Sequence, residues 1–210
     1  FTLKNWSINL TEENILKWLS RYNLVKKNKN VLIICAGNIP IVGFHDLLCC
    51  LLLGCDVQIK LSQKDDELIP SIIKILSFFD QSISKKIKIL KNKPSGYDYV
   101  IATGSDNSNR YFEYYFGEKP HIFRKNRTSI AVINKNIKDQ ELLKLSDDLL
   151  QYYGLGCRSV TKLYLPNGFN IDKLYKNLYI YKDLINHNKY MSNYDYNRSI
   201  YLLEEKKFYD

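Results

Sequence analysis

The sequence predicts an α/β fold built around a parallel sheet, and three observations lead to this prediction. The run VLIICA at 31–36 is continuously apolar, as is typical of a strand buried on both faces of a parallel sheet. Segments with helical apolar spacing separate this run from further strand-like runs. The pattern then restarts near residue 134, so we expect a first domain at 1–133 and a second at 134–210.

The first domain is expected to alternate helices and strands. A helix is predicted at 11–22, because Thr11 fits an N-cap, and Ile15, Trp18 and Leu19 share one helical face. The later predicted elements are, in order, the strand at 31–36, a helix ending near residue 53, a strand at 55–61, a helix over DDELIPSIIKILSFF, strands at 86–90 and 97–104, a helix at 109–116, and the strand-like segments PHIFRKN and SIAVIN.

The second domain is expected to be shorter and built on the same alternation. A helix over IKDQELLKLSDDLLQYYG ends at Gly154, and GCRSVTKLYLP then runs from a glycine-flanked loop into a strand. The C-terminal stretch is predicted to be helical at its end. Because no sequence that would close a second sheet follows, we expect a partial α/β unit.

The composition bears on the classes of partner. The net charge is +9, and the 31 basic residues are 25 Lys and 6 Arg. These lysines are scattered along the chain, whereas nucleic-acid binders concentrate basic residues on one stripe with stacking aromatics. Nucleic-acid binding is therefore the lesser alternative, while a few such charges suffice to attract a phosphorylated cofactor. No apolar run approaches the ~20 residues of a membrane-spanning helix, so no span is expected.

The cysteines and histidines form no metal-ligand pattern. No CxxC or Cys/His metal spacing is present, so no metal site is predicted, and an odd number of cysteines favours free thiols in a reducing cytoplasm. His45 is interpreted as a structural helix residue. The five cysteines are Cys35, Cys49, Cys50, Cys55 and Cys157.

Four loops fall at or near predicted strand ends, where parallel α/β sheets bind ligands. They are AGNIP, KLSQKD, ATGSDN and GLGCRS. In the last, Cys157 follows two glycines and precedes Arg158, and a cation and backbone N–H groups beside an exposed thiol favour the thiolate. From the residues alone, a buried structural cysteine is an equally good interpretation of Cys157.

Several blocks together resemble one family. They are GNIPIVGFHDLLCCLLLG, IKLSQKDDELIP, VIATGSDNSNRYFEYYFG, PHIFRKNRTSIAVI and YYGLGCRSV. They resemble the acyl-CoA reductases of the aldehyde dehydrogenase superfamily, in particular the fatty-acid reductase component of bacterial bioluminescence systems. The resemblance covers residues 5 to 210, and family members are longer on both sides. It implies the central portion of such an enzyme, with a Rossmann-type nucleotide-binding domain, a partial α/β catalytic domain and homo-oligomers of the full-length protein.

The resemblance also implies roles for single residues. Cys157 would be the nucleophile, and the Asn38 amide would stabilise the oxyanion together with the backbone N–H of Cys157. Gly104 and Ser105 would form the turn at a helix N-terminus that receives the cofactor pyrophosphate.

The KLSQ loop would hold the adenosine ribose, and it favours NADPH as the cofactor. Many aldehyde dehydrogenases carry an acid at the place of Gln63, and a carboxylate there would repel a 2′-phosphate. Gln63 does not repel it, and Lys60, Ser62 and Lys64 are candidates to bind it.

One departure from the family concerns water. Hydrolytic aldehyde dehydrogenases carry a general-base Glu where the blocks place Phe123, and no Glu lies between Lys119 and Ile133. A thiol is therefore the expected acyl partner. The expected activity is NADPH-dependent reduction of a long-chain acyl-CoA, or of an acyl thioester delivered by a partner protein, to the aldehyde. The alternative within this family is a non-catalytic fragment that binds nucleotide only.

Overall fold

The computed structural model describes residues 2–25, 28–125 and 127–206. The chain divides into two compact units, residues 1–126 (unit 1) and 127–210 (unit 2). The sequence placed the boundary after residue 133, whereas the structure places Ser129–Val132 in unit 2, because this strand pairs with a later strand of that unit. Residues 207–210 of the second expected domain lie outside the described part.

Unit 1 is built on a five-stranded, fully parallel sheet in the order β3-β2-β1-β4-β5. The strands are β1 (Asn30–Ile34), β2 (Asp56–Lys60), β3 (Ile87–Ile89), β4 (Tyr99–Thr103) and β5 (His121–Arg124). The chain adds β2 and β3 on one side of β1 and then β4 and β5 on the other. The strand order thus reverses between β1 and β4, which is where open α/β sheets bind ligands. The predicted α/β fold with a parallel sheet is confirmed.

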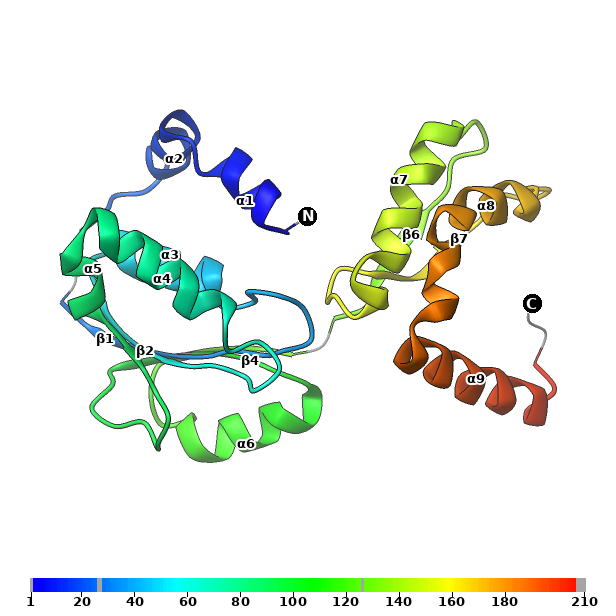
Figure 1. Ribbon diagram of the computed structural model, residues 1–210. Coiled ribbons are helices and arrows are strands. Elements are labelled where there is room, and N and C mark those ends of the chain that lie inside the picture. Colours follow the sequence, from blue (N-terminus) through cyan, green and yellow to red (C-terminus); the bar gives the residue numbers. More distant parts are fainter. Residues whose placement is uncertain (1, 26–27, 126, 207–210) are drawn as a thin grey trace. The chain divides into compact units, whose positions relative to one another are not determined.

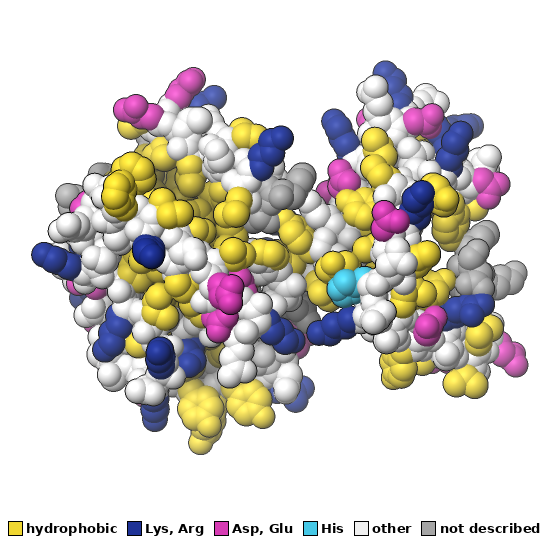
Figure 2. All heavy atoms as spheres, in the orientation of Figure 1, with side chains coloured by type: hydrophobic (Ala, Val, Ile, Leu, Met, Phe, Trp, Pro, Cys, Tyr) yellow, Lys and Arg dark blue, Asp and Glu magenta, His cyan; other side chains and the backbone are white. Residues whose placement is uncertain are grey.

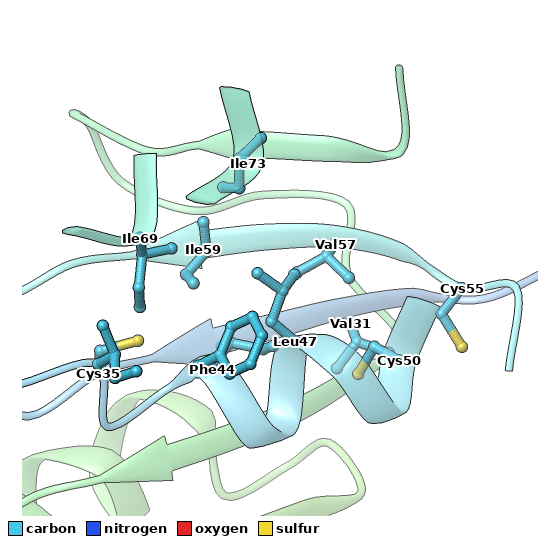
Figure 3. Packing of buried hydrophobic residues seen from close by; sticks show 12 residues of the cluster. Val31, Cys35, Phe44, Leu47, Cys50, Cys55, Val57, Ile59, Ile69 and Ile73 are labelled. Atoms are coloured by element: carbon cyan, nitrogen blue, oxygen red, sulfur yellow. The ribbon is translucent and has the colours of Figure 1, made fainter. Parts of the chain in front are cut away.

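Helices cover both faces of this sheet (Figure 1). Helices α3 (Phe44–Leu52) and α4 (Leu68–Phe79) lie on one face, and α6 (Asp106–Phe116) lies on the other. Figure 3 shows Phe44 and Leu47 of α3 packed against side chains of the central strands. The buried cluster on this face consists of Val31, Ile33, Cys35, Ile41, Phe44, Leu47, Cys50, Cys55, Val57, Ile59, Ile69 and Ile73.

Two short helices precede the sheet, and the sequence predicted one of them. Helix α2 (Glu12–Leu19) corresponds to the predicted helix, and the Thr11 hydroxyl accepts a hydrogen bond from the Asn14 N–H at 3.4 Å. Helix α1 (Thr2–Asn9) was not predicted, because its apolar residues are few; Trp6 nevertheless packs against the core. Helix α5 (Gln81–Lys86) was also not foreseen as a separate element.

Between residues 127 and 206, unit 2 has a two-stranded parallel sheet and three α-helices. Strands β6 (Ser129–Val132) and β7 (Val160–Tyr164) pair, and the helices are α7 (Asp139–Leu150), α8 (Ile171–Leu178) and α9 (Asn188–Leu203). Two 3₁₀ segments, η1 (Gln151–Gly154) and η2 (Tyr179–Asn186), connect them. The core of unit 2 is smaller than that of unit 1, and its buried members are Ile133, Leu142, Leu145 and Leu174.

The surface shows dispersed charge. On the face seen in Figure 2, Lys and Arg side chains are separated by other side chains on each unit. Within residues 2–25, 28–125 and 127–206, no helix has the length and apolar character needed to cross a bilayer.

Candidate functional site

The loops after β1 and β2 meet at the carboxyl edge of the unit 1 sheet, by which we mean the C-terminal ends of its strands and the loops that follow them. Gly37 is the contact point, because a β-carbon at this position would collide with the Ser62 side chain and lie 3.0 Å from Lys64 Cβ. Only glycine permits so close an approach. The structure therefore brings the GNIP and KLSQ segments together, as their places after neighbouring strands implied.

A pocket of about 460 Å³ lies between these two loops, lined by residues 37–40 and 63–68. Asn38 and Gln63 are on its lining, and both are exposed. The lining also carries both signs of charge: Lys64 lies with Asp65, Asp66 and Glu67. The sequence analysis predicted a phosphate-binding role for the basic residues of the KLSQK segment. It predicted no role for the acids that follow them.

Asp65 has a structural task in this pocket. Its Oδ2 accepts a hydrogen bond from the Ile41 N–H at 2.6 Å, and Ile41 has a φ of 52°. A left-handed backbone is unfavourable for a β-branched residue, so the loop needs a compensating contact. Asp65 supplies it by holding the segment that follows Asn38.

Lys60 is tied to a different loop. Its Nζ donates to the backbone carbonyl of Lys91 at 3.0 Å, which joins the end of β2 to the segment after β3. An ammonium group has three donors, so this bond leaves capacity for an anion. Ser62 is half-buried, and its Oγ accepts from the Lys64 N–H at 3.3 Å.

The TGS turn ends β4 and leads into α6, which begins at Asp106, three residues before the predicted start at 109. The Ser105 hydroxyl caps the helix by accepting from the Ser108 N–H at 3.2 Å. The Gly104 N–H donates to the carbonyl of Arg124 at 3.2 Å, so the turn is bonded to the end of β5. A β-carbon at Gly104 would lie 2.8 Å from Ser108 Cβ, which explains the glycine.

Asn109 braces this turn and was missed in the sequence. The residue is 2% exposed, and its Nδ2 donates to the carbonyls of Ser105 at 2.9 Å, Gly104 at 3.3 Å and Arg124 at 3.4 Å. A signal was available: Asn109 stands three and seven residues before Phe112 and Phe116, which pack into the core. Such spacing places the amide on the buried helical face.

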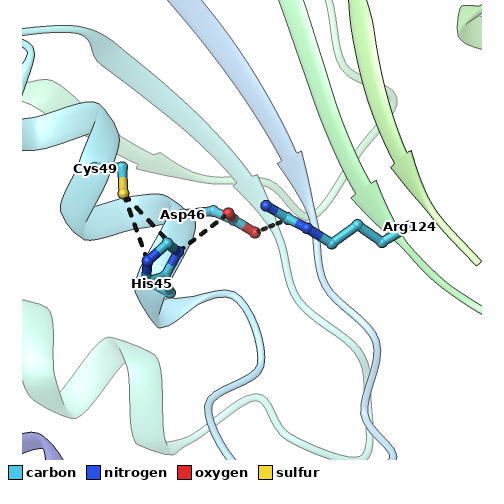
Figure 4. Close-up of polar contacts among 4 residues, drawn as sticks. All are labelled: His45, Asp46, Cys49 and Arg124. Carbon is cyan, nitrogen blue, oxygen red and sulfur yellow. Dashed lines mark hydrogen bonds and ion pairs between the residues drawn. The ribbon is translucent and has the colours of Figure 1, made fainter. Parts of the chain in front are cut away.

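A second polar brace links α3 to β5 (Figure 4). Asp46 is 5% exposed, and its Oδ2 lies 2.6 Å from Arg124 Nη1. His45 Nδ1 lies 3.7 Å from the other Asp46 oxygen, and Cys49 Sγ is 3.9 Å from both ring nitrogens of His45. Burial, with the Asp46 charge as a smaller cause, raises the pKa of Cys49, so this Cys–His–Asp grouping keeps a protonated thiol.

The other cysteines of unit 1 are also poor nucleophiles. Burial raises the pKa of Cys35 and of Cys50 to about 12 in each case. Cys55 is buried as well, whereas Cys157 is exposed. The expectation that Cys157 differs from the other four thus agrees with its exposure. No group of His, Cys, Asp and Glu suited to a metal ion occurs in the described part of the chain.

Cys157 lies in unit 2 on the loop between η1 and β7. The loop is preceded by three consecutive left-handed residues, Tyr152, Tyr153 and Gly154, with φ values of 54°, 61° and 69°. Two tyrosines in this conformation store strain. The Tyr153 ring stacks on His187, with the ring centroids 4.1 Å apart, and this contact helps to hold the turn.

His187 and His121 have structural contacts. The Nδ1 of His187 accepts from the Tyr190 N–H at 3.1 Å and so caps α9. His121 stacks on Phe123 with centroids 4.0 Å apart, and Phe123 packs in turn on Phe112 of α6. Phe123 is therefore packed between the rings of His121 and Phe112, on the face of the sheet that α6 covers.

Comparison with known proteins gives matches at the level of structure. No family model matches the sequence, and no curated protein matches it. An aldehyde dehydrogenase of Mycobacterium tuberculosis complexed with NAD⁺ is similar, with a TM-score of 0.53 and 19% identity over 71% of this chain and 33% of that chain. Aldehyde dehydrogenase 21 of Physcomitrella patens, in complex with the reaction product succinate, has a TM-score of 0.57 and 14% identity, over 71% and 34%.

A third similar structure is the AldA indole-3-acetaldehyde dehydrogenase of P. syringae, a mutant in complex with NAD⁺ and IAA. Its TM-score is 0.57 and its identity 15%, over 71% of this chain and 33% of that chain. At such identities the likeness establishes the fold. The chain therefore has part of the aldehyde dehydrogenase fold and spans about one third of the length of these structures.

Proposed function

We propose that this chain binds NADPH at the carboxyl edge of unit 1 and reduces an acyl-CoA, or another acyl thioester, to the aldehyde through an acyl-enzyme on Cys157. The observation that carries the proposal is the set of loops at that edge: GNIP against KLSQ, and the TGS turn fixed at the start of α6. The fold shared with NAD⁺-complexed aldehyde dehydrogenases supports a nucleotide at this edge.

The cofactor would be bound by backbone and side-chain donors. The first N–H groups of α6, beside Ser105, would receive the pyrophosphate, because helix N-termini carry unpaired donors and a partial positive charge. The ribose would lie at the KLSQ loop, where Gln63 leaves room for a 2′-phosphate. Lys60 and Lys64 would supply its counter-charge, against the exposed Asp66 and Glu67 nearby.

The chemistry would proceed in two steps on Cys157. The thiolate attacks the acyl carbonyl, the Asn38 amide and the Cys157 N–H stabilise the oxyanion, and the thiol of the donor leaves. When bound, NADPH would be the hydride source, and the acyl group on Cys157 would be reduced to a thiohemiacetal. Collapse of that adduct releases the aldehyde and regenerates the Cys157 thiolate.

The residue at the place of the hydrolytic base supports reduction over hydrolysis. Phe123 packs on Phe112 and His121 and has no group that could remove a proton from water. The thioester on Cys157 would therefore persist until hydride arrives. Since a thiol is the leaving group, the acyl donor would be an acyl-CoA or an acyl thioester on a partner protein.

The test is trapping of the acyl-enzyme. Incubation with a long-chain acyl-CoA without NADPH should add one acyl mass on Cys157, and added NADPH should discharge it as aldehyde. Cys157→Ala should abolish both steps, and Cys157→Ser should fail because a serine hydroxyl is far less ionised near neutral pH. Acylation that persists in Cys157→Ala contradicts the assigned nucleophile. NADPH binding without any acylation of the wild-type chain supports the alternative of a nucleotide-binding piece without catalysis.

A further inference from the structure

Asn109 is a buried amide whose orientation is fixed by its surroundings. Its Nδ2 faces the carbonyl oxygens of Gly104, Ser105 and Arg124 at 2.9–3.4 Å. The flipped amide would place oxygen against three oxygens, so the donor must point toward these carbonyls. The side chain thus joins the end of β4, the cap of α6 and the end of β5 through one nitrogen.

The other end of this amide argues against a purely stabilising role. Within the described part of the chain, Asn109 Oδ1 is buried and has no hydrogen-bond partner. A buried carbonyl oxygen without a partner lowers stability, and an alanine at this position would avoid that cost. The Ser105 carbonyl also accepts a hydrogen bond from the backbone N–H of Asn109, and the Arg124 carbonyl accepts one from the backbone N–H of Gly104. Both bonds would remain without the side-chain amide. Removing the amide therefore leaves two of the three carbonyls bonded.

What the amide adds is a fixed geometry of the turn. The Gly104 carbonyl and N–H are both bonded, the former to Asn109 and the latter to Arg124. The Ser105 hydroxyl engages Ser108, so the cap and the first turn of α6 are held as one piece. The first N–H groups of the helix, at Asp106 and Asn107, then have a set direction before any anion arrives.

We propose that Asn109 is a positioning residue for the cofactor pyrophosphate. Its buried amide pre-organises the Gly104–Ser105 turn, so the helix N–H groups meet the phosphates without reordering. This inference rests on the proposed function, because it assumes that a dinucleotide binds at this turn. It adds a residue that lies under the turn and acts through it, without touching the ligand.

The experiment compares a ligand that carries the pyrophosphate with one that lacks it. NADPH and adenosine 2′-monophosphate are titrated into the whole chain and into Asn109→Ala. We expect the variant to bind NADPH about tenfold more weakly, as for the loss of one aligned hydrogen bond, and to bind adenosine 2′-monophosphate unchanged. Asn177→Ala is the matched control: Asn177 is a half-buried helical amide that donates to the Lys173 carbonyl four residues earlier, in unit 2.

The outcomes separate this inference from the function beneath it. Equal NADPH affinity in wild type and Asn109→Ala overturns the positioning role. An equal loss of affinity for NADPH and for adenosine 2′-monophosphate also overturns it, because it would indicate general damage to unit 1. If the wild-type chain binds neither ligand, the proposed function fails and the inference fails with it. A thermal midpoint lowered by Asn109→Ala with NADPH affinity retained would show a structural amide only.

A conservative variant tests the donor directly. In Asn109→Asp, an ionised carboxylate would repel the three carbonyls, whereas a protonated one could donate to one of them. Burial favours the protonated form, so affinity for NADP⁺ should recover toward wild type as pH falls from about 8 to about 5.5. Affinity that stays as low as that of Asn109→Ala at both pH values would contradict a donor role.

Discussion

The carboxyl edge of unit 1 and the Cys157 loop of unit 2 are held by different kinds of contact. At the carboxyl edge, two nearly inaccessible polar side chains, Asn109 and Asp46, connect separate elements, and both connections end on Arg124. The Cys157 loop has an exposed thiol, and the turn before it is held by a ring stack between Tyr153 and His187. The proposed cofactor site is thus pre-organised within its own unit, whereas the proposed nucleophile is on a strained, accessible loop.

This difference matches the chemistry proposed for each region. Binding a dinucleotide gains affinity when the donors are already aligned, because less conformational freedom is lost on binding. A nucleophile that attacks, carries an acyl group and is then released needs access. The exposure of Cys157 provides that access. Cys35 and Cys50 are buried, and their protonated thiols would not compete for the acyl group.

The largest effect should come from the unit 1 core. Leu47 is fully buried between α3 and the sheet, and Leu47→Ala should lower the free energy of unfolding of unit 1 by about 3–4 kcal/mol. Leu142 of α7 is equally buried but belongs to a smaller cluster that can collapse around a cavity, so Leu142→Ala should cost about 2–3 kcal/mol in unit 2.

Hydrogen exchange of α3 and α7 under denaturant would measure these two losses separately. Leu143→Ala, at a residue of α7 that is 41% exposed, is the control and should cost less than about 1 kcal/mol. An equal or larger loss for Leu142→Ala than for Leu47→Ala would contradict the view that unit 1 is the more tightly packed region.

The next effect concerns the Asp46–Arg124 pair. Asp46→Asn keeps the shape but removes the charge, and should lower the stability of unit 1 by about 1–3 kcal/mol; solvent reaches Arg124 and limits the loss. Asp46→Asn combined with Arg124→Met should cost less than the sum of the two single variants, because they share one interaction. Chemical denaturation of the four proteins measures this coupling, and strict additivity would show that the pair contributes nothing.

A half-buried pair in unit 2 should contribute less to stability, and its contribution should depend on pH. The Tyr181 hydroxyl donates to Asp147 at 2.7 Å, and burial, followed by this bond, raises the pKa of Tyr181 to about 12. The neutral phenol is therefore favoured in the fold. Its contribution is fully present below the ordinary tyrosine pKa near 10 and is lost as pH rises toward about 12.

Tyr181→Phe should accordingly cost about 0.5–1.5 kcal/mol at neutral pH. The difference from wild type should shrink between about pH 10 and pH 12, when the wild-type phenol ionises. Thermal unfolding of both proteins across this range provides the measurement, with Tyr179→Phe at an exposed position as the control. A stability difference that stays constant to pH 12 would contradict the assigned hydrogen bond.

The sequence predicted the regular part of unit 1 well, because its signals are local. The run at 31–36 became the central strand β1, and the TGS segment became the end of β4 and the cap of α6. Ser129–Val132 was assigned to the first domain because its own residues do not show which strand it pairs with. Its partner, Val160–Tyr164, lies about thirty residues away, and pairing at that distance leaves no local trace.

The polar braces could not be predicted as pairs for the same reason. Arg124 follows Asp46 by 78 positions and looked like one of several surface charges in RKNR. Helical periodicity could have predicted that Asn109 is buried. Its three carbonyl partners could not be predicted, because they depend on the arrangement of β4 and β5. The acids lining the pocket at 37–40 and 63–68 become relevant only when both loops are folded together.

The smallest effect should come from the strained turn before Cys157. Tyr152 is left-handed with a φ of 54°, a conformation that asparagine tolerates better than tyrosine. Tyr152→Asn should raise the free energy of unfolding of unit 2 by about 0.5 kcal/mol. Glycine also tolerates this conformation, but it would increase the conformational entropy of the unfolded chain and so offset the gain. Tyr179→Asn, at a right-handed residue with a φ of −59°, should give no gain. If Tyr152→Asn instead destabilises unit 2, the tyrosine side chain contributes more than its backbone costs, and the turn before Cys157 is held by side-chain packing in the same manner as the carboxyl edge of unit 1.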